Sequence, residues 1–330
     1  MLNLRQLKHL TRTLNTSQEL VTNVCDSIDD YYQTLILNDP AKPNKKREVV
    51  NVTGELRRLQ SNLYSRILLK KLKPSIYTHG GIRGRSIKTN AEAHLSSSYI
   101  FKTDISNFYP SIRYSRIYEM FLKDFNCSPD VARVCTRICT YKHHLALGLI
   151  TSPILADQLI SNIDKRIGTA CLKAGLVYTR FVDDISISGH FNLYQSGFEN
   201  IVTDILCSQG FNINQTKNEF SQLGKKTSIT GIRILNNKKL DVKKEYADEL
   251  ERQLKDAKSL ANNQTFEGPY FTEGQIRGRV EFVRWINPHR GKYLIKIFKL
   301  IPWDRVVKVA SDRNLVALKK TLRKKDEIPA

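Results

Sequence analysis

The sequence predicts a mixed α+β fold with a centre built from strands and a helical C-terminal lobe. Runs of β-branched and aromatic residues in the middle of the chain are typical of strands, at residues 99–104, 176–181 and 185–188. After residue 235 the composition changes to charged segments with apolar residues at helical spacing, such as Leu250 and Leu254. The sheet is therefore expected in the centre of the chain.

The first hundred residues are predicted to be mainly helical. Apolar residues recur at helical spacing through residues 1–38, which predicts one or two helices. A turn-rich basic break at residues 38–46 separates them from a short strand at 47–52 and a helix at 55–72. A Gly-rich basic loop follows at residues 79–86.

The central strands end on acidic residues. The strand at residues 99–104 ends on Asp104, and the two later strands flank Val182, Asp183 and Asp184. That arrangement predicts a hairpin with two acids at its tip. Helices are expected between the strands, including residues 152–167, and the last sixty residues are helix-rich and basic.

Composition narrows the classes of partner. The 330 residues include 53 Lys or Arg and 32 Asp or Glu, giving a net charge of +21. Such a surplus favours nucleic acid over a solvated basic surface without a ligand. No apolar run reaches the roughly 18 residues of a membrane span, so no membrane partner is expected. The six cysteines form no C-x-x-C pair, which favours free thiols in a reducing, cytoplasmic location.

Three acids are candidates for catalysis. If their strands are neighbours in one sheet, Asp104, Asp183 and Asp184 converge, and their repulsion favours a bound divalent cation. Oxygen ligands without His or Cys suit Mg²⁺ or Mn²⁺, and two such ions support in-line attack of a 3′-hydroxyl on a nucleotide. Because side chains alternate along a strand, Asp183 is expected to be the better-placed ligand and Asp184 to support it. The alternative is that each acid caps a turn.

The same acids lie in motifs that resemble those of reverse transcriptases. Residues 101–112 resemble motif A, and residues 181–184 resemble the Y-x-D-D box with Phe181 in place of Tyr. Residues 148–156 are similar to motif B, and residues 45–50 resemble the basic fingertip strand that holds the triphosphate. The motifs follow the order of the family, which makes a chance match rare.

The resemblance implies an RNA-directed DNA polymerase with a right-hand architecture. We expect N-terminal helices and fingers at residues 1–97, a palm with an antiparallel sheet at 98–236, and an RNA-binding helical thumb at 237–330. A helical, fingers-like segment is expected within the palm at about 119–147. The residues expected to catalyse DNA synthesis and to hold two Mg²⁺ ions, with Mn²⁺ as an alternative, are Asp104, Asp183 and Asp184.

Two further motifs resemble the retron group. Residues 90–94 match its N-A-x-x-H signature, and residues 229–231 resemble its V-T-G signature. The resemblance implies an enzyme that copies a structured non-coding RNA of its own locus, priming from a 2′-hydroxyl in that RNA. The product is branched, RNA-linked single-stranded DNA (msDNA), and an effector protein from the same locus is expected in antiphage defence. The alternatives are a group II intron-like or abortive-infection reverse transcriptase, or an inactive RNA-binding scaffold.

The resemblance also assigns residues that contact nucleotides. Tyr109 matches the bulky residue that excludes a 2′-hydroxyl, and a core Tyr is the alternative. Leu147 stands where the family usually has Gln, so nucleotide or template handling is expected to differ. The residues expected to contact dNTPs are Arg47, Tyr109, Gly148 and Lys217.

Residues that contact the RNA and its cDNA are expected in three segments: the Gly-rich loop, the retron signatures and the thumb. Arg side chains offer forked donors for phosphate oxygens, although any single one is as compatible with a solvated surface. Asn90 and His94 are four residues apart, so they could equally face one side of a helix as structural hydrogen-bonding groups. The expected RNA-binding residues are Arg83, Arg85, Asn90, His94, Thr230, Arg279, Arg284 and Lys292.

Overall fold

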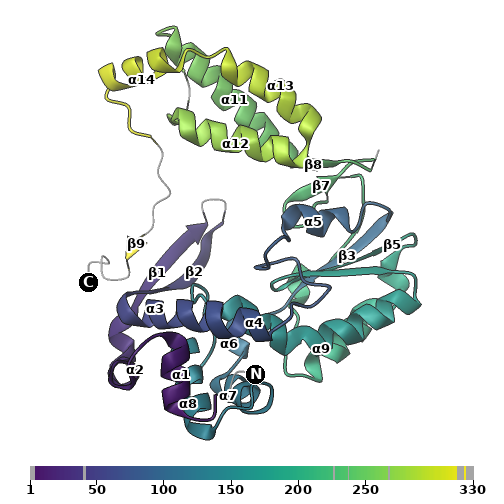
Figure 1. The fold of residues 1–330 in the computed structure, drawn as a ribbon. Coiled ribbons are helices and arrows are strands. Elements are labelled where there is room, and N and C mark those ends of the chain that lie inside the picture. Colours follow the sequence, from purple (N-terminus) through teal and green to yellow (C-terminus); the bar gives the residue numbers. More distant parts are fainter. Residues whose placement is uncertain are drawn as a thin grey trace.

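The computed structural model describes most of the chain, namely residues 4–39, 42–225, 227–236, 238–266, 268–317 and 323–324. At residues 38–39, 42–46 and 323–324 it describes the backbone alone. Figure 1 shows a ribbon of strands beside the N-terminal helices, a central sheet, and a C-terminal group of helices. The mixed α+β fold predicted from the sequence is confirmed.

The central sheet has four antiparallel strands in the order β4-β5-β3-β6. They are β3 (Tyr99–Asp104), β4 (Val177–Phe181), β5 (Asp184–Gly189) and β6 (Glu219–Gln222). The hairpin β4–β5 therefore forms where the sequence predicts it. The long helix α9 (Ser152–Lys173) lies along one face of the sheet (Figure 1). It packs against β4, and its buried apolar residues join the core of the sheet.

The N-terminal part contains a strand that the sequence analysis missed. Residues 32–38 were predicted to be helical, but β1 (Tyr32–Asp39) is a strand that pairs antiparallel with β2 (Lys42–Val52). The predicted turn-rich break is also wrong in extent, because residues 38–39 and 42–46 belong to these strands. The isolated sequence could not indicate this, because a strand is stabilised by its pairing partner more than by local preference. Backbone pairing also joins β1 to β9 (Arg323–Lys324).

Several shorter helices precede the C-terminal bundle. The predicted helix at residues 55–72 is present as α3 (Gly54–Leu63), a π-helical turn at Tyr64–Leu68, and α4 (Leu69–Lys71). The segment expected to be helical at about 119–147 contains the end of α7 (Tyr114–Lys123) and the whole of α8 (Pro129–Cys139). The remaining helices before the C-terminal lobe are α1 (Leu7–Leu14), α2 (Gln18–Asp26), α5 (Ile87–Glu92), α6 (Phe108–Ser111) and α10 (Phe198–Cys207). Short 3₁₀ turns lie at Ile28–Tyr31, Leu193–Gln195 and Gln215–Lys217.

The C-terminal bundle has a hydrophobic core of its own. Its helices are α11 (Lys244–Ala261), α12 (Glu273–Ile286), α13 (Pro288–Lys299) and α14 (Trp303–Asp312). The same core includes apolar residues of the small hairpin β7 (Ile232–Ile234) and β8 (Leu240–Val242), and Ala91 of α5. The expected boundary at residue 236 falls between these two strands. The hairpin and α5 thus connect the bundle to the central sheet (Figure 1).

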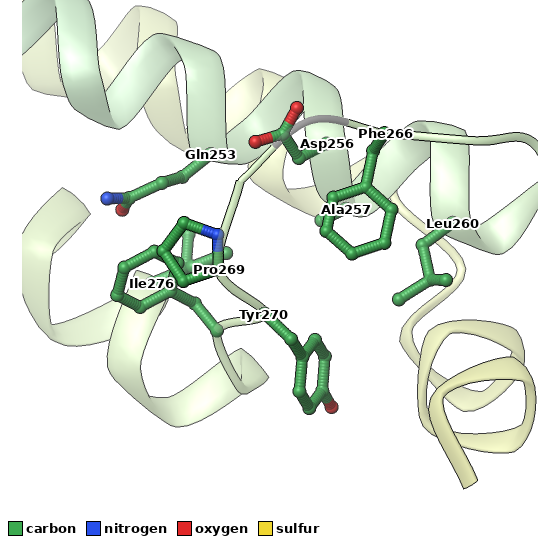
Figure 2. Close-up of a pocket in the computed structure, with 9 residues that line it drawn as sticks. Gln253, Asp256, Ala257, Leu260, Phe266, Pro269, Tyr270 and Ile276 are labelled. Atoms are coloured by element: carbon green, nitrogen blue, oxygen red, sulfur yellow. The ribbon is translucent and has the colours of Figure 1, made fainter. Parts of the chain in front are cut away.

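A small apolar pocket lies inside this bundle (Figure 2). Leu260 and Phe266 line it, as do Pro269, Tyr270 and Ile276, and its volume is about 10 Å³. That is about the size of a single water molecule, so the pocket is a packing defect of the bundle core.

Across the described part of the chain, no helix has both the length and the apolar character that crossing a bilayer requires.

Candidate active site

The central sheet brings the three predicted acids together. Asp104 is the last residue of β3 and pairs directly across the sheet with Asp184, the first residue of β5. Asp183 occupies the turn between β4 and β5, and its carbonyl oxygen accepts a 2.9 Å hydrogen bond from the backbone N–H of Ile105. Each acid offers a carboxylate oxygen within 4.8 Å of the others. Antiparallel pairing therefore converts acids far apart in sequence into one cluster.

Mutual repulsion is built into this cluster. Burial and the nearby charges of Asp183 and Asp104 raise the pKa of Asp184 to about 6. Burial, followed by the charge of Asp104, also raises the pKa of Asp183. Lys217 offsets part of this charge, with its Nζ 2.5 Å from Oδ2 of Asp104. A compact group of hard oxygen donors with excess negative charge fits a divalent cation of the Mg²⁺ or Mn²⁺ type.

The turn that carries Asp183 has a strained backbone. Val182 adopts a left-handed conformation with φ +61°, which is rare for a β-branched residue. Gly80 of the Gly-rich loop lies directly against it, and a Cβ at this glycine would come within 2.6 Å of Cγ2 of Val182. The backbone N–H of His79 also donates to the carbonyl of Arg180 at 2.7 Å. The loop at residues 79–86 therefore packs against the acid-bearing turn, and only glycine fits at position 80.

Arg180 holds this turn from the other side, and the sequence analysis did not identify it. Its guanidinium is buried and donates to both carboxylate oxygens of Asp164 at 2.8–2.9 Å and to Asp157 at 2.7 Å. The remaining nitrogen donates to the carbonyl oxygen of Val182 at 2.8 Å. Asp164 also accepts a 2.7 Å hydrogen bond from the hydroxyl of Tyr178. Arg180 is thus a positioning residue that ties the turn before Asp183 to helix α9.

A signal for this network is present in the sequence. Asp157 and Asp164 are seven residues apart, which places them on one face of α9 among buried apolar residues. Acids on a buried face need a cation, and Arg180 is a cation in a strand whose side chains are otherwise apolar or neutral.

Of the residues expected to contact dNTPs, Tyr109, Arg47 and Lys217 lie near the acidic cluster, and Gly148 packs on β2. Tyr109 is half-buried in α6, and burial, with the charge of Asp183 as the next cause, raises the pKa of its hydroxyl to about 12. Gly148 has φ +109°, and a Cβ there would lie 2.2 Å from the carbonyl oxygen of Val50. The carbonyl of Leu147 accepts a 2.8 Å hydrogen bond from Val50, so this loop rests on β2. Arg47 is exposed on the same strand.

Two of the expected RNA contacts lie inside the protein and not on its surface. Asn90 and His94 are buried, so neither side chain can reach an RNA on the surface. The two ring nitrogens of His94 lie 2.6 Å from Oγ of Ser188 and 2.8 Å from Oγ1 of Thr179, which links the strands of the catalytic hairpin. Burial lowers the pKa of His94 to about 3, so its ring is neutral. His94 lies in the turn just after α5, and its hydrogen bonds favour a structural role for this side chain.

Asn90 connects α5 to the other retron-like motif. Its Nδ2 donates to Oγ1 of Thr230 at 3.4 Å. Lys88, on the same helix, donates to the carbonyl oxygen of Trp285 in α12 at 2.8 Å. Because His94 contacts the sheet and Lys88 contacts the bundle, the segment at residues 86–94 joins the two cores. Thr230 has φ +47° and lines a cleft that also includes Asp104, Asp184 and Lys217.

The basic residues of the loop and the bundle have different environments. Arg85 is half-buried and donates to the carbonyls of Ser75 and Thr78, so it holds the loop in shape, whereas Arg83 is exposed. The guanidinium of Arg279 stacks over Phe271 at 4.5 Å. The other two residues of the bundle expected to contact RNA, Arg284 and Lys292, are exposed. Arg284 forms an ion pair with Glu281, and Lys292 forms none among the described residues.

Comparisons with known proteins agree with this geometry. The sequence matches the family described as "Reverse transcriptase (RNA-dependent DNA polymerase)" over residues 39–253. The chain therefore belongs to the reverse transcriptase family and is an RNA-directed DNA polymerase with the right-hand polymerase fold. Similarity to several curated retron enzymes makes it, within that family, a retron-type reverse transcriptase.

The curated relatives share about a quarter of their residues with this chain. The retron Ec86 reverse transcriptase of Escherichia coli is 25% identical over 292 residues, which cover 88% of each chain. The retron Mx65 reverse transcriptase of Myxococcus xanthus is 24% identical over 73% of this chain and 58% of its own. Apo telomerase from Candida tropicalis gives a TM-score of 0.49 at 12% identity, covering 89% of this chain and 63% of its own. The telomerase likeness is too distant to assign a function.

Replacing Tyr109 with Val is expected to admit ribonucleotides. If the ring occupies the space beside the sugar, a smaller side chain leaves room for a 2′-hydroxyl, so discrimination against rNTPs falls on the order of ten- to hundredfold. The measurement is kcat/KM for dNTP and rNTP incorporation on the same primed RNA. Phe at position 109 keeps the ring and is the matched control. An unchanged ratio in the Val variant would assign Tyr109 to the core alone.

Proposed function

We propose that this enzyme copies a structured non-coding RNA of its own locus into msDNA, starting from a 2′-hydroxyl of that RNA. The observation that carries the proposal is the cluster of Asp104, Asp183 and Asp184 at adjoining strand ends, in a chain whose curated relatives are retron reverse transcriptases. An intact set of acids argues against a scaffold that has lost catalysis. The net charge of +21 suits an RNA partner and the cDNA made on it.

The cofactor that fits the acidic cluster is a pair of Mg²⁺ ions, with Mn²⁺ as the alternative. Such ions supply neutralisation of phosphate charge and a lowered pKa for the attacking hydroxyl. Among the residues of this chain, Asp183 and Asp104 would hold them, with Asp184 at the rim. Lys217, Arg47 and residues of the motif B loop would orient the dNTP, because cations near the cluster pair with phosphate oxygens.

The C-terminal bundle would act as the thumb that grips RNA through its phosphates. Replacing Arg279, Arg284 and Lys292 together with Ala is expected to weaken binding to cognate and unrelated RNA alike. Each lost phosphate contact should flatten the slope of log Kd against log salt by about 0.7–0.9. Filter binding from 50 to 400 mM salt measures the affinity for each RNA and its salt dependence. Loss of cognate binding alone would instead assign these residues to sequence recognition.

The proposal also includes the compartment of the enzyme and a protein partner. We place the enzyme in the cytoplasm, because its six cysteines are free and a reducing compartment suits them. An effector protein from the same locus would bind the complex of enzyme, RNA and DNA in antiphage defence. Exposed apolar side chains on the bundle, including Leu300 and Val307, offer a contact surface for it.

Expression of the gene with its flanking DNA tests the proposal in cells. The expected result is a short single-stranded DNA that is joined to RNA and changes its electrophoretic mobility after RNase treatment. The Asp183→Asn variant should give none. A cell extract that contains the protein and its RNA but no such DNA contradicts the proposal.

A further inference from the structure

A groove outside the acidic cluster is lined by lysines. Helix α9, the end of α4 and the segment at residues 73–77 enclose a volume of about 460 Å³. None of the lining residues is acidic. The residues that line the groove are Lys71, Lys73, Pro74, Ser75, Ile76, Tyr77, Gln158, Ser161, Lys165 and Thr169.

The sequence of α9 explains why this groove is so basic. Residues 158, 161, 165 and 169 recur at three to four positions, so they form one exposed stripe of the helix. The two acids of the helix, Asp157 and Asp164, lie on the adjacent buried face, where both form ion pairs with Arg180. The stripe therefore presents Lys165 to solvent, and neither acid of α9 lines the groove.

The opposite wall of the groove is held in a fixed shape. The backbone N–H of Ser75 donates to Oδ2 of the buried Asp157 at 3.0 Å. Tyr77 packs over Gly168, where a Cβ would come within 2.1 Å of the ring, and it also contacts the ring of Tyr178. Lys71 and Lys73 are exposed beside this anchored segment, and in the described chain neither forms an ion pair. The lysines are thus placed by a rigid frame.

We propose that this groove binds the sugar-phosphate backbone of the structured RNA, away from the nucleotides being copied. The inference rests on the proposed function and names a second contact surface for the same RNA. Three lysines that face one concavity without acids match a run of phosphates, and lysine binds phosphate as a point charge. A template held at the acidic cluster and a folded stem held across α9 would be bound at two places at once, which increases retention of the RNA.

The experiment compares two triple variants of the full chain. In the first, Lys71, Lys73 and Lys165 become Ala; in the second, the same three become Arg, which retains the charge. Affinity for the RNA transcribed from the flanking DNA is measured by filter binding from 50 to 200 mM salt. Three lost contacts predict that wild type loses about 20- to 40-fold more affinity over this range than the Ala variant. The Arg variant should match wild type.

Extension of a short primed RNA separates this inference from the proposed function. A short duplex offers the groove few phosphates, so wild type and the Ala variant should extend it at equal rates when it is supplied at saturating concentration. If wild type does not extend this duplex, the proposed function fails. The binding data still decide whether the groove contacts RNA. Wild-type affinity and salt slope in the Ala variant overturn the inference. Loss of a protein partner with unchanged RNA binding overturns it as well, because the groove would then bind protein.

Discussion

Replacing Asp183 with Asn is expected to reduce DNA synthesis by two or more orders of magnitude. The change removes a negative charge from the acidic cluster and keeps the shape of the side chain. If the cluster supplies several kcal/mol of transition-state stabilisation through bound cations, each 1.4 kcal/mol lost lowers the rate about tenfold. The measurement is single-turnover extension of a primed RNA. Asp204→Asn, an exposed acid of α10, is the matched control.

Stability separates this effect from misfolding. The pKa of Asp183 is raised, which means that its ionised form is disfavoured by folding. Above that pKa the charge lowers stability, so Asn should leave the metal-free protein as stable as wild type or more stable. Added Mg²⁺ should raise the unfolding temperature of wild type more than that of the variant. A variant that synthesises DNA at the wild-type rate contradicts the catalytic assignment.

Replacing Arg180 with Met is expected to lower the free energy of unfolding by about 3–5 kcal/mol, because two buried carboxylates lose their cation. The buried ion pairs of Arg180 with Asp157 and Asp164 span 2.7 and 2.8 Å. Urea unfolding followed by circular dichroism measures the loss. Arg133→Met, in an exposed pair, should change stability by less than about 1 kcal/mol.

Arg180→Lys tests the positioning role separately from the charge. Lysine keeps one positive charge for the acids but cannot reproduce the fork that also reaches the carbonyl of Val182. The variant should fold, bind RNA normally and require a higher Mg²⁺ concentration for half-maximal synthesis, because the turn before Asp183 is less fixed. If its metal dependence equals that of wild type, Arg180 acts on stability alone.

Local patterns in the sequence were sufficient to predict the core of the site. Alternating strands that end on Asp104 and enclose the Asp183–Asp184 turn predict a hairpin, and antiparallel pairing then brings the acids together. The strand β1 escaped prediction because its partner β2 decides its conformation. The Arg180 network escaped it because the packing of α9 on β4 joins residues distant in sequence.

Burial was the property that the sequence could not supply. The spacing of Asn90 and His94 indicates a shared helix face, yet it does not say whether the face points to RNA or into the protein. In the structure, His94 follows the end of α5 and contacts the hairpin strands through Thr179 and Ser188, whereas Asn90 contacts Thr230. Residues that look like a recognition signature therefore set the geometry between sheet and bundle, which is one physical way for a motif to matter without touching a ligand.

The most direct test of the account is an unprimed reaction with purified protein. The RNA transcribed from the flanking DNA is incubated with Mg²⁺ and labelled dNTPs, and the products are separated before and after RNase and DNase treatment. We expect labelled DNA that is covalently attached to the RNA, and none with unrelated RNA or with the Asp183→Asn variant. Bound RNA without any labelled DNA, from a protein that extends an ordinary primer, would contradict self-primed synthesis.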